Sequence, residues 1–136
     1  MAKYRLIEEE AAPKVAVVGI SCHVPDYRLC WSLNRALGLG LTRRRADITE
    51  QVRGKELHYS VFEQADPGGN VRWALVCNTC GRRRLLPDQK LADLFLVVDE
   101  EMITADLLDR VRGAEFVLTA YTVEMSELKS GHKLLL

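Results

Sequence analysis

The sequence predicts an α+β domain with a single mainly antiparallel β-sheet and two α-helices packed on one face of it. Two nearly continuous apolar runs, residues 15–20 and 91–98, have the composition of central strands covered on both sides. Short turns join most of the expected strands, which favours antiparallel pairing. At 136 residues, 48% hydrophobic and 28% charged, the chain has the size and balance of one globular domain spanning residues 1–136.

The first elements are expected to be two strands and a helix. Residues 3–10 alternate apolar and charged side chains in part, and residues 15–20 are rich in β-branched residues. The helix is expected over residues 25–37, because Pro25 suits a first helical turn and Gly38 suits a left-handed helix end.

This first helix is expected to be mostly buried. At about 100° per residue, Arg28, Ser32 and Arg35 share one narrow polar face. The remainder of the surface is apolar and includes Tyr27 and Trp31.

Strand-forming runs and turn signals alternate along the rest of the chain. A turn cluster at residues 66–70 lies between two such runs and predicts a β-hairpin, whereas residues 49–55 are expected to form a polar loop. The expected elements are strands over residues 39–42 or 39–48, 57–62, 71–76, 91–98 and 115–123, a helix over residues 104–112, and a tail over residues 126–136 that can be flexible.

Two polar side chains in apolar surroundings mark a candidate site. Asn34 lies on the apolar side of the first helix and Asp93 lies inside an apolar strand. Each must find partners, since a buried polar group without a hydrogen bond costs roughly 1–3 kcal/mol. Each can bond to a neighbouring loop, and Asp93 can instead pair with Arg28. The functional alternative is a polar ligand site formed by Asn34, Asp93, Arg28 and Tyr27, with Asn34 and Asp93 facing the same interior.

The motif Cys77-x-x-Cys80 suggests a metal site. Two cysteines at this spacing on a turn can bind one tetrahedral zinc ion, and Gly81 eases the turn. The candidates for the missing ligands form no second close pair; they are Cys22, His23, Cys30 and His58. We therefore expect two reduced cysteines at a strand end. The alternative is a zinc-stabilised domain, and no other cofactor is expected.

Basic residues concentrate in the middle of the chain, although the formal net charge is zero. Clustered Lys and Arg side chains can bind the phosphates of a nucleic acid. The candidate contacts are the two arginine triplets, Arg43, Arg44, Arg45, Arg82, Arg83 and Arg84.

The sequence lacks several signatures of catalysis and of membrane insertion. It has no glycine-rich phosphate loop, no nucleophile elbow and no helix with paired metal-binding histidines, so an enzyme is not the favoured class. No run approaches the roughly 18 apolar residues of a spanning helix, and the first ten residues are charged. A cytoplasmic protein without a membrane partner is expected.

Two segments carry a family resemblance. DYRLCWSLN at residues 26–34, preceded by GIS at residues 19–21, resembles the opening motif of the small bacterial family named after the signature IPExxxVDY. LPDQKLADL at residues 86–94 resembles the signature itself, with Pro87 and Asp93 matching. The resemblance implies no particular activity, cofactor or catalytic residue.

These observations predict a non-catalytic binding or scaffolding domain that acts through a protein partner. The alternative from another class is a nucleic-acid (RNA)-binding module that uses the basic middle segment, residues 28–90.

Overall fold

The computed structural model describes residues 14–135. The strand expected over residues 3–10 lies outside the described residues.

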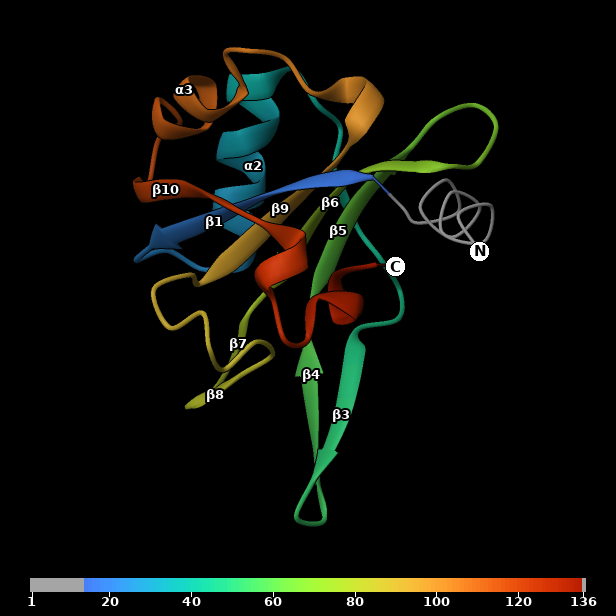
Figure 1. Ribbon diagram of the computed structural model, residues 1–136, viewed down its shortest axis with the longest axis vertical. Helices are drawn as coiled ribbons and strands as arrows, with labels where there is room; N and C mark the ends of the chain where they lie inside the picture. Colours follow the sequence, from blue (N-terminus) through green and yellow to red (C-terminus); the bar gives the residue numbers. More distant parts are fainter. Residues whose placement is uncertain (1–13, 136) are drawn as a thin grey trace, which may run out of the picture.

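The centre of the fold is a six-stranded sheet with the strand order β10-β1-β9-β6-β5-β2 (Figure 1). Every strand pair in it is antiparallel. The two apolar runs expected as central strands are the neighbours β1 and β9. The strands are β1 (Val15–Cys22), β2 (Thr42–Arg43), β5 (Val61–Ala65), β6 (Val71–Cys77), β9 (Leu94–Asp99) and β10 (Val117–Val123).

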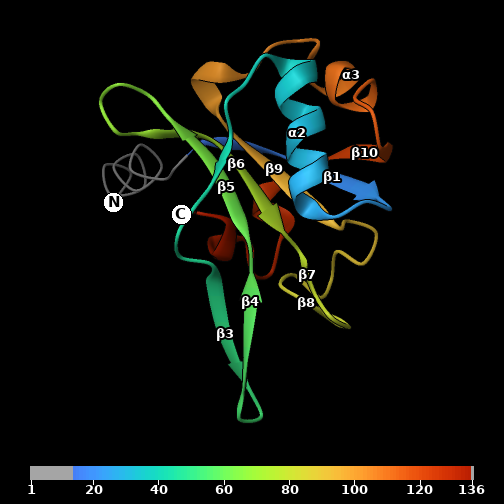
Figure 2. The same ribbon diagram turned by 180° about the vertical axis from the view of Figure 1, so that it is seen from behind.

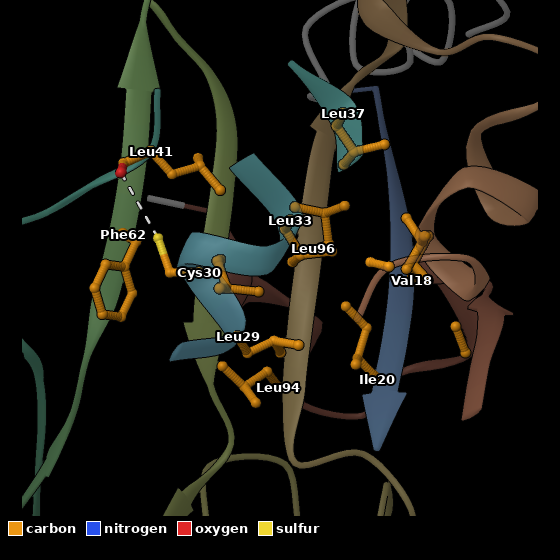
Figure 3. Close-up of a cluster of buried hydrophobic side chains, with 14 of the residues drawn as sticks. Val18, Ile20, Leu29, Cys30, Leu33, Leu37, Leu41, Phe62, Leu94 and Leu96 are labelled. Atoms are coloured by element: carbon orange, nitrogen blue, oxygen red, sulfur yellow. Dashed lines mark hydrogen bonds between the residues drawn. The ribbon is translucent and has the colours of Figure 1, made fainter. Parts of the chain in front are cut away.

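Two helices, α2 (Asp26–Leu37) and α3 (Leu107–Arg112), pack on one face of this sheet (Figure 2). Helix α2 follows Pro25 and ends at Gly38, whose φ of 67° is the left-handed conformation expected there. Leucines of α2 lie over Val18 and Ile20 of β1 and over Leu94 and Leu96 of β9 (Figure 3). The α+β fold with a mainly antiparallel sheet and two packed helices is thereby confirmed.

The opposite face of the sheet is covered by irregular chain. Residues 125–135, which include the 3₁₀ turns Met125–Glu127 and Gly131–Leu134, lie across this face, in front of the sheet in Figure 1. Leu128 and Leu134 from this tail, together with Leu85 and Leu86, bury the second hydrophobic cluster. Both faces of the sheet are thus covered, which explains the continuous apolar runs of β1 and β9.

A second hairpin, β3 (Ile48–Val52) and β4 (Lys55–Tyr59), extends away from the sheet (Figure 1). The expectation of a polar loop over residues 49–55 is wrong here. The two-residue turn between the strands places Arg53 and Gly54 at φ values of 51° and 79°. Positive φ at both positions is typical of the tight turn that matches the twist of paired strands. Because the hairpin stands out from the body, its strands carry little of the apolar pattern that reveals a strand in the sequence.

A third, minimal hairpin joins β7 (Thr79–Cys80) and β8 (Arg83–Arg84) through Gly81, whose φ is 59°. Strands β5 and β6 form the expected hairpin around residues 66–70, whereas the strand expected over residues 57–62 is divided between β4 and β5. Helix α3 and strand β10 each begin later than expected, and a 3₁₀ turn, Glu100–Met102, follows β9.

Candidate functional site

The outward side of α2 carries two exposed aromatic side chains one turn apart. Tyr27 is 63% exposed and Trp31 is 48% exposed. Arg35 places its guanidinium over the Trp31 ring, 4.9 Å from the centroid. The expectation that Tyr27 and Trp31 belong to a buried apolar side is wrong. The expectation that Ser32 lies on the polar face with Arg28 and Arg35 is also wrong. Ser32 is buried, and its hydroxyl donates to the backbone carbonyl of Glu115.

Arg28 extends this surface towards the loop before β10. Its guanidinium lies over the Phe116 ring, 4.7 Å from the centroid. Phe116 has a φ of 75°, a conformation that costs a non-glycine residue about 1–3 kcal/mol. We call the group Tyr27, Arg28, Trp31, Arg35 and Phe116 the α2 surface.

Asn34 serves the backbone of the segment that leaves α2. Its side-chain amide donates to the carbonyl of Leu41 at 3.1 Å, and its carbonyl oxygen accepts from the Leu41 N–H at 2.9 Å. The Cys30 thiol bonds to the same Leu41 carbonyl at 3.6 Å (Figure 3). These contacts correspond to the structural alternative for Asn34, in which the amide fixes the geometry of a neighbouring loop.

Asp93 accepts a hydrogen bond from the backbone N–H of Cys22 at 3.0 Å. Asp93 directly precedes β9 and is not part of the strand, and its own backbone N–H donates to the Ile20 carbonyl at 2.8 Å. Asn34 and Asp93 thus bond to different segments, Leu41 and Cys22. That the two residues face the same interior stays a prediction.

The four residues proposed for one polar site therefore have separate partners. Arg28 stacks on Phe116 and does not pair with a carboxylate among the described residues, while Tyr27 points into solvent. The structure brings Tyr27 and Arg28 together on the α2 surface. It does not bring either of them to Asp93.

The two cysteines of the CxxC motif stand on consecutive strands, β6 of the main sheet and the short β7. Cys77 ends β6 and its thiol donates to the Thr79 carbonyl at 3.4 Å; Cys80 lies on β7. Within residues 14–135, no group of three or more His, Cys, Asp or Glu side chains could hold a metal ion. All four cysteines are free thiols. Burial raises the pKa of the Cys30 thiol to about 11 and also raises the pKa of Cys22.

The most connected residue of this motif is Asn78, which the sequence analysis did not single out. Its fully buried side chain donates to the carbonyls of Gln89 and Ala92 and accepts from the Leu86 N–H at 2.8 Å. Its backbone carbonyl also accepts from the Leu85 N–H. Asn78 thereby holds residues 85–92 against the end of β6. An asparagine between two cysteines at a turn is the only sequence signal for this role.

The two arginine triplets lie on opposite sides of β5. Residues 43–45 belong to the edge strand β2 and its following loop, where Arg43 pairs with Asp47 at 3.2 Å and Arg44 bonds to the Ala46 carbonyl. Residues 82–84 belong to the β7–β8 hairpin, beyond β6. The two triplets do not form one continuous basic patch.

Two aromatic residues beside the expected hairpin turn, Tyr59 and Trp73, are not exposed for stacking on bases. Tyr59 is fully buried in the second hydrophobic cluster, and Trp73 packs against the first. The exposed aromatic residues lie instead on α2.

No known protein family, curated protein or solved structure matches this chain. The resemblance of residues 19–34 and 86–94 to the IPExxxVDY family stays a prediction. None of the described helices is long and apolar enough to cross a membrane.

Proposed function

We propose that this protein is a non-catalytic binding domain that docks a protein partner on the α2 surface. The observation that carries the proposal is the exposure of Tyr27 and Trp31 side by side, each next to a stacked arginine. Tyr, Trp and Arg are the residues that dominate the energy of protein interfaces.

The geometry of the α2 surface supports docking in a second way. Arg28 and Arg35 are already ordered by their stacking on Phe116 and Trp31, so a partner has less side-chain freedom to restrict on binding. A shallow hollow of about 470 Å³ next to Tyr27, Arg28 and Trp31 can receive a side chain of the partner.

The charge of the surface indicates the chemistry of the partner. Neither Arg28 nor Arg35 forms an ion pair with another residue in the described part of the chain. A partner segment that combines carboxylates with apolar side chains would meet both the guanidinium groups and the aromatic rings.

The test is the recovery of partners from an extract of the source cells with the native chain and two variants. Trp31→Ala removes an aromatic residue of the α2 surface, and Leu91→Ala removes a 76% exposed apolar side chain elsewhere. We expect Leu91→Ala to recover the same partner as the native chain. Trp31→Ala should weaken the affinity for that purified partner by about 30-fold, the loss typical of an interface hot spot. Equal affinities for all three proteins would contradict the proposal.

RNA binding is a second candidate, favoured by the exposed arginines of the β7–β8 hairpin. Arg82 and Arg83 have no ion pair with any residue between 14 and 135. Phosphate contacts would make RNA affinity fall steeply with salt concentration. Binding of generic RNA and DNA measured at two salt concentrations tests this candidate, and no binding at the lower concentration would exclude it.

A further inference from the structure

A groove of about 570 Å³ lies between the β3–β4 hairpin and the β7–β8 hairpin. We call it the hairpin groove. Its volume falls in the range of small-molecule sites, roughly 300–1,000 Å³. Its walls are partly apolar, with Val52 and Leu57 from one hairpin and Pro87 from the loop that Asn78 holds.

The charged side chains in the groove are almost all basic. They are Arg82, Arg83, Arg84, Lys90 and Lys133, against one carboxylate, Glu50. Glu50 is already paired with Lys133 at 2.7 Å, and Arg84 bonds to the carbonyl of Ala92. Among the described residues, Arg82, Arg83 and Lys90 have no acidic partner, so the groove keeps an unbalanced positive charge.

A second, independent feature is the hydroxyl of Tyr59. Tyr59 lines the hairpin groove, its side chain is fully buried, and its hydroxyl has no hydrogen-bond partner within residues 14–135. A buried polar atom left in this state is rare in folded proteins and indicates a missing partner. A tyrosine hydroxyl already keeps its proton at neutral pH, because its usual pKa is about 10. Burial, followed by the charge of Glu50, raises the pKa of this phenol further.

We propose that the hairpin groove binds a small phosphate monoester with an apolar body. Arg82, Arg83 and Lys90 bind the phosphate, and the Tyr59 hydroxyl donates to an oxygen of the ligand. Guanidinium groups match phosphate oxygens in charge and geometry. The apolar walls accept the organic part of the ester. This site is separate from the α2 surface and does not depend on the function proposed above.

The direct test is calorimetric titration of the purified full chain with phenyl phosphate and with inorganic phosphate. We expect phenyl phosphate to bind more tightly than inorganic phosphate, because only the ester contacts the apolar walls. The absence of binding of either probe up to about 10 mM, near the limit of useful affinity, would overturn the proposal.

The first variant tests the role of the Tyr59 hydroxyl. Tyr59→Phe removes only the hydroxyl and should weaken phenyl phosphate binding by about tenfold, the value of a hydrogen bond to a charged group. Since this hydroxyl has no hydrogen-bond partner among residues 14–135, Tyr59→Phe should unfold at the same or a higher urea concentration than the native chain. Marked destabilisation by Tyr59→Phe would show that the hydroxyl is already partnered and would contradict the proposal.

Arg83→Gln and Arg45→Gln form a matched pair. Both side chains are exposed and belong to an arginine triplet, but only Arg83 lines the hairpin groove. We expect Arg83→Gln to weaken binding by about tenfold and Arg45→Gln to leave it unchanged. Equal losses of affinity in both variants would indicate general charge attraction and would contradict the proposed site.

A short single-stranded RNA is the final probe. If the RNA binds more tightly than phenyl phosphate, and both Arg83→Gln and Arg45→Gln weaken it, the basic residues serve a nucleic acid and the small-ester proposal is wrong. Binding of phenyl phosphate without measurable RNA binding supports it.

Discussion

Replacing Asn78 is the sharpest perturbation of the part of the fold that shapes the hairpin groove. Asn78→Ala removes three side-chain hydrogen bonds at once, two donated to the carbonyls of Gln89 and Ala92 and one accepted from the Leu86 N–H. The three lost partners do not cost the same. The Ala92 carbonyl keeps a hydrogen bond from Arg84 at 3.1 Å. Gln89 is only partly buried, so its carbonyl can accept a hydrogen bond from water.

The largest cost falls on Leu86, which is fully buried and loses the only partner of its N–H among the described residues. An orphaned buried donor costs about 1–3 kcal/mol, and each of the other two bonds contributes about 0.5–1.5 kcal/mol. We therefore expect Asn78→Ala to lower the free energy of unfolding by about 3 kcal/mol. That is a large part of the roughly 5–15 kcal/mol that stabilises a typical domain.

Urea denaturation followed by fluorescence measures this loss. With a dependence of about 2 kcal/mol per molar urea, the midpoint should fall by about 1.5 M. Asn70→Ala is the matched control, because Asn70 is exposed in a turn and its two bonds to Asp66 use only the backbone of Asn70. The control should stay within about 0.5 kcal/mol of the native chain.

Asn78→Asp separates the hydrogen bonds from the packing. The carboxylate keeps the acceptor for the Leu86 N–H but faces the carbonyls of Gln89 and Ala92 without a donor. At neutral pH we expect Asn78→Asp to be at least as unstable as Asn78→Ala. Burial raises the pKa of such an aspartate, so acidification should protonate it and restore a donor. The loss of unfolding free energy relative to the native chain should then become smaller. A loss below about 1 kcal/mol for Asn78→Ala would refute the reasoning, because the buried network would then contribute little.

Two further predictions concern the sheet and the buried thiols. A Cβ at Gly19 would lie 2.6 Å from Cζ of Tyr121, so Gly19→Ala should cost about 1–3 kcal/mol in urea denaturation. The cost should shrink in a Tyr121→Ala background, and equal costs in both backgrounds would contradict this contact. Because burial raises the pKa of Cys30 to about 11, mass spectrometry at pH 8 should show iodoacetamide modifying the partly exposed Cys77 and Cys80 first. The raised pKa favours the folded state while the unfolded thiol is still protonated, so the contribution of Cys30 to stability should fall as the pH rises from about 9 towards 11.

The sheet could be predicted because its burial is two-sided. Val17 and Val18 are neighbours in the chain, yet they enter opposite hydrophobic clusters. Such a strand has no polar face, so its sequence is a continuous apolar run. The boundaries of α2 are predictable for a different reason: Pro25 and Gly38 constrain the backbone locally, and no tertiary contact is needed to recognise them.

The exposure of α2 could not be predicted from the helical pattern alone. A helical projection groups Ser32 with Arg28 and Arg35, but it does not include the Glu115 carbonyl that accepts the Ser32 hydroxyl bond. Once Ser32 is buried, the exposed side of the helix shifts towards Trp31. The helical pattern alone thus predicts a core position for Tyr27 and Trp31, the exposed aromatic residues of the α2 surface.

The hairpin groove depends on contacts between distant segments, which explains why no stretch of sequence reveals it. Lys133 joins three of these segments, because its ammonium group bonds to the Leu85 carbonyl at 3.0 Å and pairs with Glu50 of β3. The C-terminal tail, the loop held by Asn78 and the β3–β4 hairpin therefore meet at one side chain. The spacing of apolar residues cannot predict this contact, since each of the three segments contributes polar or irregular sequence. Because the tail also buries Leu134 beneath the sheet, the position of Lys133 is fixed by the second hydrophobic cluster.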